Sequence, residues 1–135
     1  MRNPPKVLTV FDSEALSRVI AQDPYLRSVA LDAYLVKAPV IVSAATLIEV
    51  TYPKMNRAGF DWAISRLRII PVTEHLAKEA SKLLADAGMH GHKHALDAMV
   101  AATAIQVGGV PYLFTSDPDD IRALVGKAAS VIPLT

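Results

Sequence analysis

Short apolar runs, rich in β-branched residues, alternate along this chain with longer segments of helical periodicity. Each run has the length and composition of a buried strand. Strands that follow one another through helical crossovers favour a mainly parallel sheet with helices on both faces. We therefore predict an α/β fold with a four- to five-stranded, mainly parallel sheet. The predicted strands are Val7–Phe11, Val40–Val42, Ile69–Val72, Tyr112–Thr115 and, as the fifth, Val131–Ile132.

The helical segments between these runs have recognisable starts and stops. Proline is tolerated in the first turn of a helix, and glycine commonly ends one. Pro71 predicts an edge strand or a strand end, because proline lacks the N–H that a central strand donates. The segment 90–93 is predicted to be a loop. The predicted helices are Ser13–Gln22, Pro24–Lys37, Ala44–Val50, Gly59–Arg68, a helix from Thr73 to Gly88, His94–Val107 and Pro118–Val125.

The length of 135 residues predicts a single domain, residues 1–135, and a hydrophobic content of 52% is enough to build its core. The absence of cysteine excludes disulfides and thiolate zinc sites. A net charge of +1 gives no global electrostatic footprint for nucleic acid. Met1–Lys6 does not resemble the apolar stretch of a signal peptide, and no segment is apolar enough to cross a membrane. We expect a soluble, cytoplasmic protein.

Four acidic residues stand close to the ends of the predicted strands. Asp12 follows the first strand directly, and Asp117 comes two residues after the fourth. Glu49 lies in the helix after the second strand, and Asp97 lies in the first turn of the alanine-rich helix that leads into the fourth. Ligands of parallel sheets bind beyond the carboxyl ends of the strands. We therefore expect these acids to lie at one rim of the sheet.

Carboxylates that are brought together and partly desolvated repel one another, and a divalent cation relieves that repulsion. Oxygen ligands without cysteine favour Mg²⁺ or Mn²⁺ over zinc. Three of the four acids also have an ordinary structural explanation, and Asp97 is the hardest to explain in that way. Asp12 and Asp117 could be helix caps, the latter in a favourable Asp-Pro-Asp-Asp sequence, and Glu49 could pair with Lys54 or Arg57 at the surface.

At these positions the sequence resembles the PIN domain family. The resemblance rests on four ordered motifs, of which the third is the most specific, and it extends over nearly the whole chain. The motifs are Val10-Phe11-Asp12-Ser13, Ala45-Thr46-Leu47-Ile48-Glu49, His94-Ala95-Leu96-Asp97-Ala98-Met99-Val100-Ala101-Ala102-Thr103-Ala104 and Phe114-Thr115-Ser116-Asp117-Pro118-Asp119-Asp120.

The resemblance implies a three-layer α/β/α sandwich and a Mg²⁺- or Mn²⁺-dependent endoribonuclease. It also implies a toxin of the VapC kind, the toxic half of a type II toxin–antitoxin pair, which forms a homodimer and is neutralised by a VapB-like antitoxin. Tyr25, Tyr34 and Leu35 fall on the early helices, where related toxins dimerise or receive the antitoxin.

The family's acidic positions match Asp12, Glu49, Asp97 and Asp117 as catalytic residues and metal ligands. The last acidic position of the family matches Asp120 better than Asp119, and Ser13 and Thr115 match small hydroxyl residues that support the site. The chemistry that follows is RNA phosphodiester hydrolysis, in which carboxylates hold one or two metal ions that activate a water molecule.

Three histidines, His90, His92 and His94, stand beside this site in the sequence. A zinc site built from them lacks a helical placement that would fix its geometry, and we favour a solvated loop for the first two. His94 would share a helix face with Asp97, three residues later, and could approach a substrate phosphate, as could Lys93.

Two other functions compete with the nuclease. A PIN-like module that binds RNA or protein without catalysis would have the same fold, although such modules lose acids freely. A phosphatase with an aspartyl nucleophile at Asp12 would place a second Asp two residues later, where this chain has Glu14.

Overall fold

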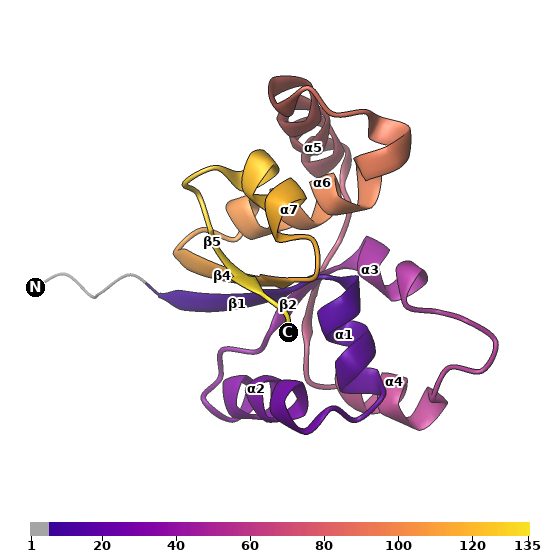
Figure 1. Ribbon diagram of the computed structural model, residues 1–135. Helices are drawn as coiled ribbons and strands as arrows, with labels where there is room; N and C mark the ends of the chain where they lie inside the picture. The colour runs from indigo at the N-terminus through magenta and orange to yellow at the C-terminus, as the bar shows by residue number, and fades with distance from the viewer. Residues whose placement is uncertain (1–5) are drawn as a thin grey trace, which may run out of the picture.

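The computed structural model describes residues 6–135, and its centre is a five-stranded sheet in which every neighbouring pair of strands is parallel (Figure 1). The strand order is β3-β2-β1-β4-β5, so that β1 lies between β2 and β4. The predicted parallel sheet is therefore confirmed, with five strands. Residues 1–5, which are part of the segment compared with a signal peptide, lie outside the described residues. The strands are β1 Val7–Phe11, β2 Ile41–Ser43, β3 Arg68–Ile70, β4 Val110–Thr115 and β5 Ser130–Pro133.

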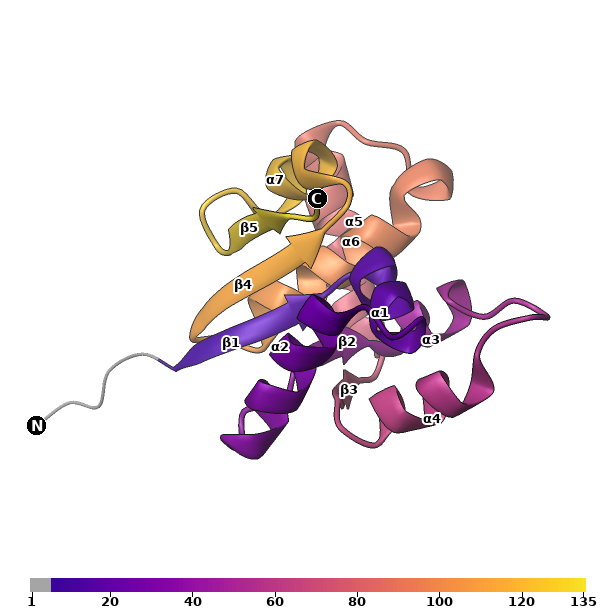
Figure 2. The same cartoon turned by 60° about the horizontal axis from the view of Figure 1, so that its bottom comes forward.

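Helices cover both faces of this sheet and give the three-layer α/β/α arrangement that was expected (Figures 1 and 2). Helices α1, α2 and α4 pack on one face, and α5, α6 and α7 pack on the other. The short helix α3 leaves the carboxyl end of β2 and lies at the rim of the sheet. The helices are α1 Ser13–Ile20, α2 Pro24–Leu35, α3 Ala44–Glu49, α4 Arg57–Ile64, α5 Glu74–Ala87, α6 Gly91–Gln106 and α7 Pro118–Val125.

Two apolar clusters, one on each face of the sheet, form the core. Alternate strand residues supply them, because successive side chains of a strand point to opposite faces. Val10 packs with α5, α6 and α7, whereas its neighbour Phe11 packs with α1, α2 and α4, and both are fully buried. Apolar side chains therefore cover both faces of the sheet, and a polar site is expected at the ends of the strands.

Most helices begin at a residue whose side chain accepts a hydrogen bond from the first turn. Asp12, Asp23, Ser43, Asn56 and Thr73 cap α1 to α5 in this way. Helices α6 and α7 begin without such a bond. Since side-chain capping satisfies orphan N–H groups at a helix start, these two starts are exceptional in this fold.

Most predicted elements differ from the structure by a few residues at one end or both, and three of these differences have a local physical reason. Residues 91–93, predicted as loop, form a helical turn that joins α6 through a kink at His94, where φ is −122° and ψ is 17°. Helix α4 begins at Arg57 rather than Gly59, because Asn56 accepts a hydrogen bond from the N–H of Gly59 at 3.0 Å. Strand β3 is Arg68–Ile70 rather than Ile69–Val72, and its position at the edge of the sheet and its end before Pro71 confirm what was predicted for a residue without an N–H. In the described part of the chain, no helix combines the length and hydropathy needed to cross a membrane.

Candidate metal-binding site

The carboxyl ends of β1 and β4 lie side by side and bring two distant acidic segments together. Phe11 pairs with Phe114, and the N–H of Asp12 donates to the carbonyl oxygen of Phe114 at 3.1 Å. The residues that follow each strand therefore meet at one rim of the sheet. Asp12 comes from the first strand, and Ser116 and Asp117 come from the fourth.

Asp12 holds its carboxylate in a fixed orientation. One oxygen, Oδ1, accepts a hydrogen bond from the N–H of Ala15 at 2.9 Å, and the other, Oδ2, accepts from the N–H of Ser116 at 2.9 Å. The residue is only 5% exposed. A carboxylate has about four acceptor positions, so each oxygen keeps one free for a further ligand. Asp12 is therefore the helix cap that the sequence allowed, and it can still bind a cation.

Asp97 is the most strongly perturbed acid in this region. Burial raises its pKa to about 6, helped by the negative charges of Asp117, Asp120 and Glu49, while His94 lowers it. Carboxylates from α3 and from the start of α7 thus lie close enough to repel that of Asp97 on α6. The structure therefore gathers acids from separate parts of the chain at one place.

Asp117 stands at the cap position of α7, but its side chain makes no capping bond. Its own N–H donates to the Oγ1 atom of Thr115 at 2.9 Å, and this threonine is fully buried. Capping therefore does not account for the carboxylate of Asp117, which is exposed and free to bind a ligand. Thr115 fixes the backbone of this turn.

The two acids that follow Pro118 point to different environments. The side chain of Asp119 is fully exposed, and Arg122 Nη1 lies 3.7 Å from its Oδ1. The side chain of Asp120 is about half exposed, at 46%, and its Oδ2 lies 3.7 Å from His94 Nδ1. Asp120, and not Asp119, therefore joins the group around Asp97.

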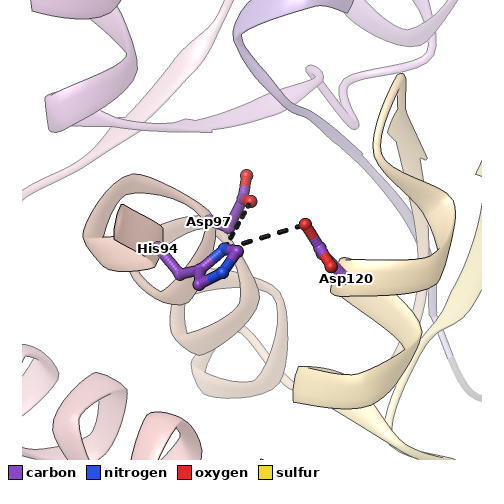
Figure 3. A group of neighbouring side chains, drawn as sticks. All are labelled: His94, Asp97 and Asp120. Atoms are coloured by element: carbon purple, nitrogen blue, oxygen red, sulfur yellow. Dashed lines mark ion pairs between the residues drawn. The ribbon is translucent and has the colours of Figure 1, made fainter. Parts of the chain in front are cut away.

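His94 completes a compact group of three donor residues with Asp97 and Asp120 (Figure 3). Its Nδ1 atom lies 3.9 Å from Asp97 Oδ2, and one ligand atom from each residue falls within 4.8 Å of the other two. His90 and His92 are exposed, and their ring centroids are 5.9 Å apart. The sequence placed His94 on the face of Asp97 but gave no sign of the contact with Asp120.

Glu49 and Ser13 occupy the margins of the site. Glu49 is exposed, and the surface pairing that the sequence allowed is not formed in the described chain, where Arg57 pairs with Asp61 at 3.6 Å. Ser13 is the first residue of α1 and is partly buried. Its hydroxyl makes no hydrogen bond among the described residues, in contrast to that of Thr115.

The donor set suits a small divalent cation. Carboxylate oxygens dominate, as Mg²⁺ and Mn²⁺ prefer, and the raised pKa of Asp97 reflects a repulsion between carboxylates that a cation would relieve. The residues present therefore fit a Mg²⁺ or Mn²⁺ ion.

Comparisons with known proteins agree with this fold. The family model described as PIN domain matches residues 9–126. No curated protein matched the sequence.

Solved structures with a similar fold cover nearly the whole chain. VapBC2 from Rickettsia felis bound to a DNA fragment from its promoter is 17% identical, with a TM-score of 0.71 over 96% of this chain and 100% of that one. FitAcB from Neisseria gonorrhoeae is 22% identical, with a TM-score of 0.63 over 93% and 96% of the two chains. FitAB bound to the IR36 DNA fragment is also 22% identical, with a TM-score of 0.62 over 93% and 94%.

Proposed function

The chain belongs to the PIN domain family, and we propose that it is a Mg²⁺- or Mn²⁺-dependent endoribonuclease that acts as the toxin of a type II toxin–antitoxin pair. One observation carries the proposal. Four separate segments bring Asp12, Glu49, Asp97 and Asp117, with Asp120, to one rim of the sheet, and the pKa of Asp97 is raised there to about 6. Perturbed carboxyl groups that converge from distant segments are typical of functional sites.

Each acid has a distinct part in the proposed hydrolysis. Asp12 and Asp97 would be the principal metal ligands, joined by Asp117 and Asp120, and two backbone hydrogen bonds fix the Asp12 carboxylate for this role. A bound divalent ion supplies Lewis-acid stabilisation of the scissile phosphate and lowers the pKa of a coordinated water. Glu49 is exposed, so it can bind through water or accept the proton of the attacking water.

The similar solved structures support the toxin part of the proposal. They are VapBC2 with promoter DNA and the FitAB and FitAcB complexes, and they cover 93% or more of this chain. We extend this to a cognate VapB-like antitoxin as partner, RNA as substrate and a homodimer as the assembly. Tyr25, Tyr34 and Leu35 are all exposed on α2, where the antitoxin could bind.

The test is RNA cleavage by purified protein with and without a metal chelator. We expect cleavage in Mg²⁺ or Mn²⁺, its loss in EDTA and its return when the metal is restored. Asp97→Asn should lower the rate by at least about a hundredfold, because it removes a metal ligand and not merely a residue that orients one.

Asp119→Asn is the matched control, because Asp119 lies in the same turn as Asp120 but is fully exposed and paired with Arg122. It should cleave like the wild type. Undiminished cleavage by folded Asp97→Asn protein would contradict the nuclease proposal. If the purified protein cleaves no RNA in the presence of metal, that result would favour the non-catalytic binding module.

A further inference from the structure

We propose that His94 is itself a metal ligand, so that its imidazole nitrogen joins Asp97 and Asp120 in one coordination site that prefers Mn²⁺ to Mg²⁺. This inference rests on the proposed metal site and adds to the acids a ligand that the resemblance does not imply. Its basis is the position of the ring between two carboxylates from two helices, α6 and α7 (Figure 3).

The distances between the donor atoms fit a shared ion better than a direct ion pair. His94 Nδ1 lies 3.7 Å from Asp120 Oδ2 and 3.9 Å from Asp97 Oδ2. Hydrogen bonds between nitrogen and oxygen have distances of about 2.7–3.2 Å, so the ring donates to neither carboxylate. Atoms that each lie about 2.1 Å from one ion are roughly 3–4.2 Å apart in octahedral coordination. Both distances from His94 Nδ1 fall in this range, and one ligand atom from each of the three residues lies within 4.8 Å of the other two.

The backbone of α6 directs His94 toward the carboxylates. The helix is kinked at this residue, and His94 N–H still closes the preceding turn by donating to the carbonyl of His90 at 3.0 Å. Three residues later, Asp97 lies on the same face of the straight part of the helix. The His94 side chain is 17% exposed, whereas His90 and His92 in the same turn are open to solvent.

A nitrogen ligand changes which metal the site selects. Mg²⁺ binds oxygen ligands almost exclusively, whereas first-row transition metals accept imidazole readily. A site with two carboxylates and one imidazole should therefore bind Mn²⁺ more tightly than Mg²⁺, and the difference should depend on His94.

The decisive experiment is electron spin echo envelope modulation of the Mn²⁺-loaded protein, which detects nitrogen bound directly to the ion. The wild type should show the coupling of a coordinated imidazole nitrogen, and His94→Gln should lose it. His92→Gln is the matched control, since it removes an exposed histidine two residues away, and it should keep the coupling. His94→Gln should also weaken Mn²⁺ binding by about tenfold or more and Mg²⁺ binding less.

The outcomes separate this inference from the proposed function. Mn²⁺ that binds to wild-type protein without nitrogen coupling overturns the role of His94 and leaves the carboxylate site intact. A coupling that survives in His94→Gln, or one that disappears in His92→Gln, overturns it as well. Failure of the wild type to bind Mn²⁺ at all contradicts the metal site itself and, with it, the proposed nuclease. The wild-type spectrum can decide against His94 even if the variant does not fold.

Discussion

Asp97 carries a charge that works against the stability of the folded chain when no metal is bound. Its pKa rises from 3.8 to about 6 on folding, through burial and then through the charges of Asp117, Asp120 and Glu49. Between these two pH values the folded chain binds more protons than the unfolded chain, so stability falls as pH rises through the window. The protonated carboxyl group makes its full contribution to the free energy of unfolding below about pH 3.8, and this contribution is lost above about pH 6.

Replacing Asp97 with asparagine should therefore stabilise the metal-free protein at neutral pH. The full shift corresponds to about 3 kcal/mol, and partial solvent exposure of the side chain reduces the expected gain to roughly 1–2 kcal/mol. Urea unfolding in EDTA at pH 7.5 should show this gain for Asp97→Asn, and the difference should shrink at pH 4.5. Asp119→Asn should unfold like the wild type. A less stable Asp97→Asn protein at pH 7.5 would show that Asp97 is a structural residue.

At the same scale, the sequence predicted that these acids come together but not which hydrogen bonds they make. The sequence allowed capping for both Asp12 and Asp117. For Asp117, the Asp-Pro-Asp-Asp sequence favoured capping over metal binding. In the structure Asp12 caps α1, while the Asp117 side chain makes no capping bond. The reason lies in tertiary structure, because Thr115 accepts the N–H of Asp117 and Ser116 donates to Asp12 across 104 positions of sequence. Periodicity carries no information about such contacts.

The crossing of helices α1 and α4 depends on one residue without a side chain. A Cβ atom at Gly59 would lie 2.1 Å from the carbonyl oxygen of Ile20, and Gly59 is buried. Backbone cannot yield as the end of a side chain can, so α4 would have to move away from α1. This crossing holds the helical layer that contains Asp12 at the start of α1.

We expect Gly59→Ala to lower the free energy of unfolding by about 2 kcal/mol or more, as overpacking of a well-packed contact does. Gly91→Ala is the matched control, since its Cβ would meet only Leu84 Cδ1 at an ordinary 3.8 Å in a helical turn. That variant should be unchanged or more stable by up to about 1 kcal/mol. Urea unfolding measures both, and equal stability of Gly59→Ala and wild type would contradict the close approach.

Element bounds were predictable where local chemistry marks them. Pro118 and Gly88 fixed the start of α7 and the end of α5. The first turn of α6 was missed, because His90, Gly91, His92 and Lys93 carry neither apolar periodicity nor a capping side chain. Local hydrogen bonds close that turn, from the N–H groups of Lys93 and His94 to the carbonyl oxygen of His90, and the turn leads directly into His94.

At the scale of the whole molecule, the sequence predicted a common rim but not which acids are neighbours. Any parallel sheet places the carboxyl ends of its strands at one edge. The pairing of β1 with β4, rather than with β2 alone, brings Asp12 to Ser116, and that strand order follows from packing across the full sheet. Helical periodicity alone also did not predict which apolar side chains remain exposed on the surface.

An apolar hollow of about 530 Å³ lies next to Glu49, between α3, the segment after β3 and α6. Ile48, at its edge, is 80% exposed, and Val72 and Leu96 line it while remaining partly open to solvent. A protruding side chain beside a hollow suits a two-fold interface, in which each copy supplies both features to the other. We predict that the homodimer forms through this surface.

Sedimentation equilibrium should then show a dimer for the wild type and a weaker one for Ile48→Ser. Because a two-fold interface counts each substitution twice, the dissociation constant should rise by on the order of a hundredfold. Leu35→Ser is the control, since Leu35 is 66% exposed on α2, which packs on the opposite face of the sheet from α6. It should leave the dimer unchanged. A monomeric wild type would contradict the homodimer, whereas a dimer sensitive to Leu35→Ser and not to Ile48→Ser would move the interface to α2.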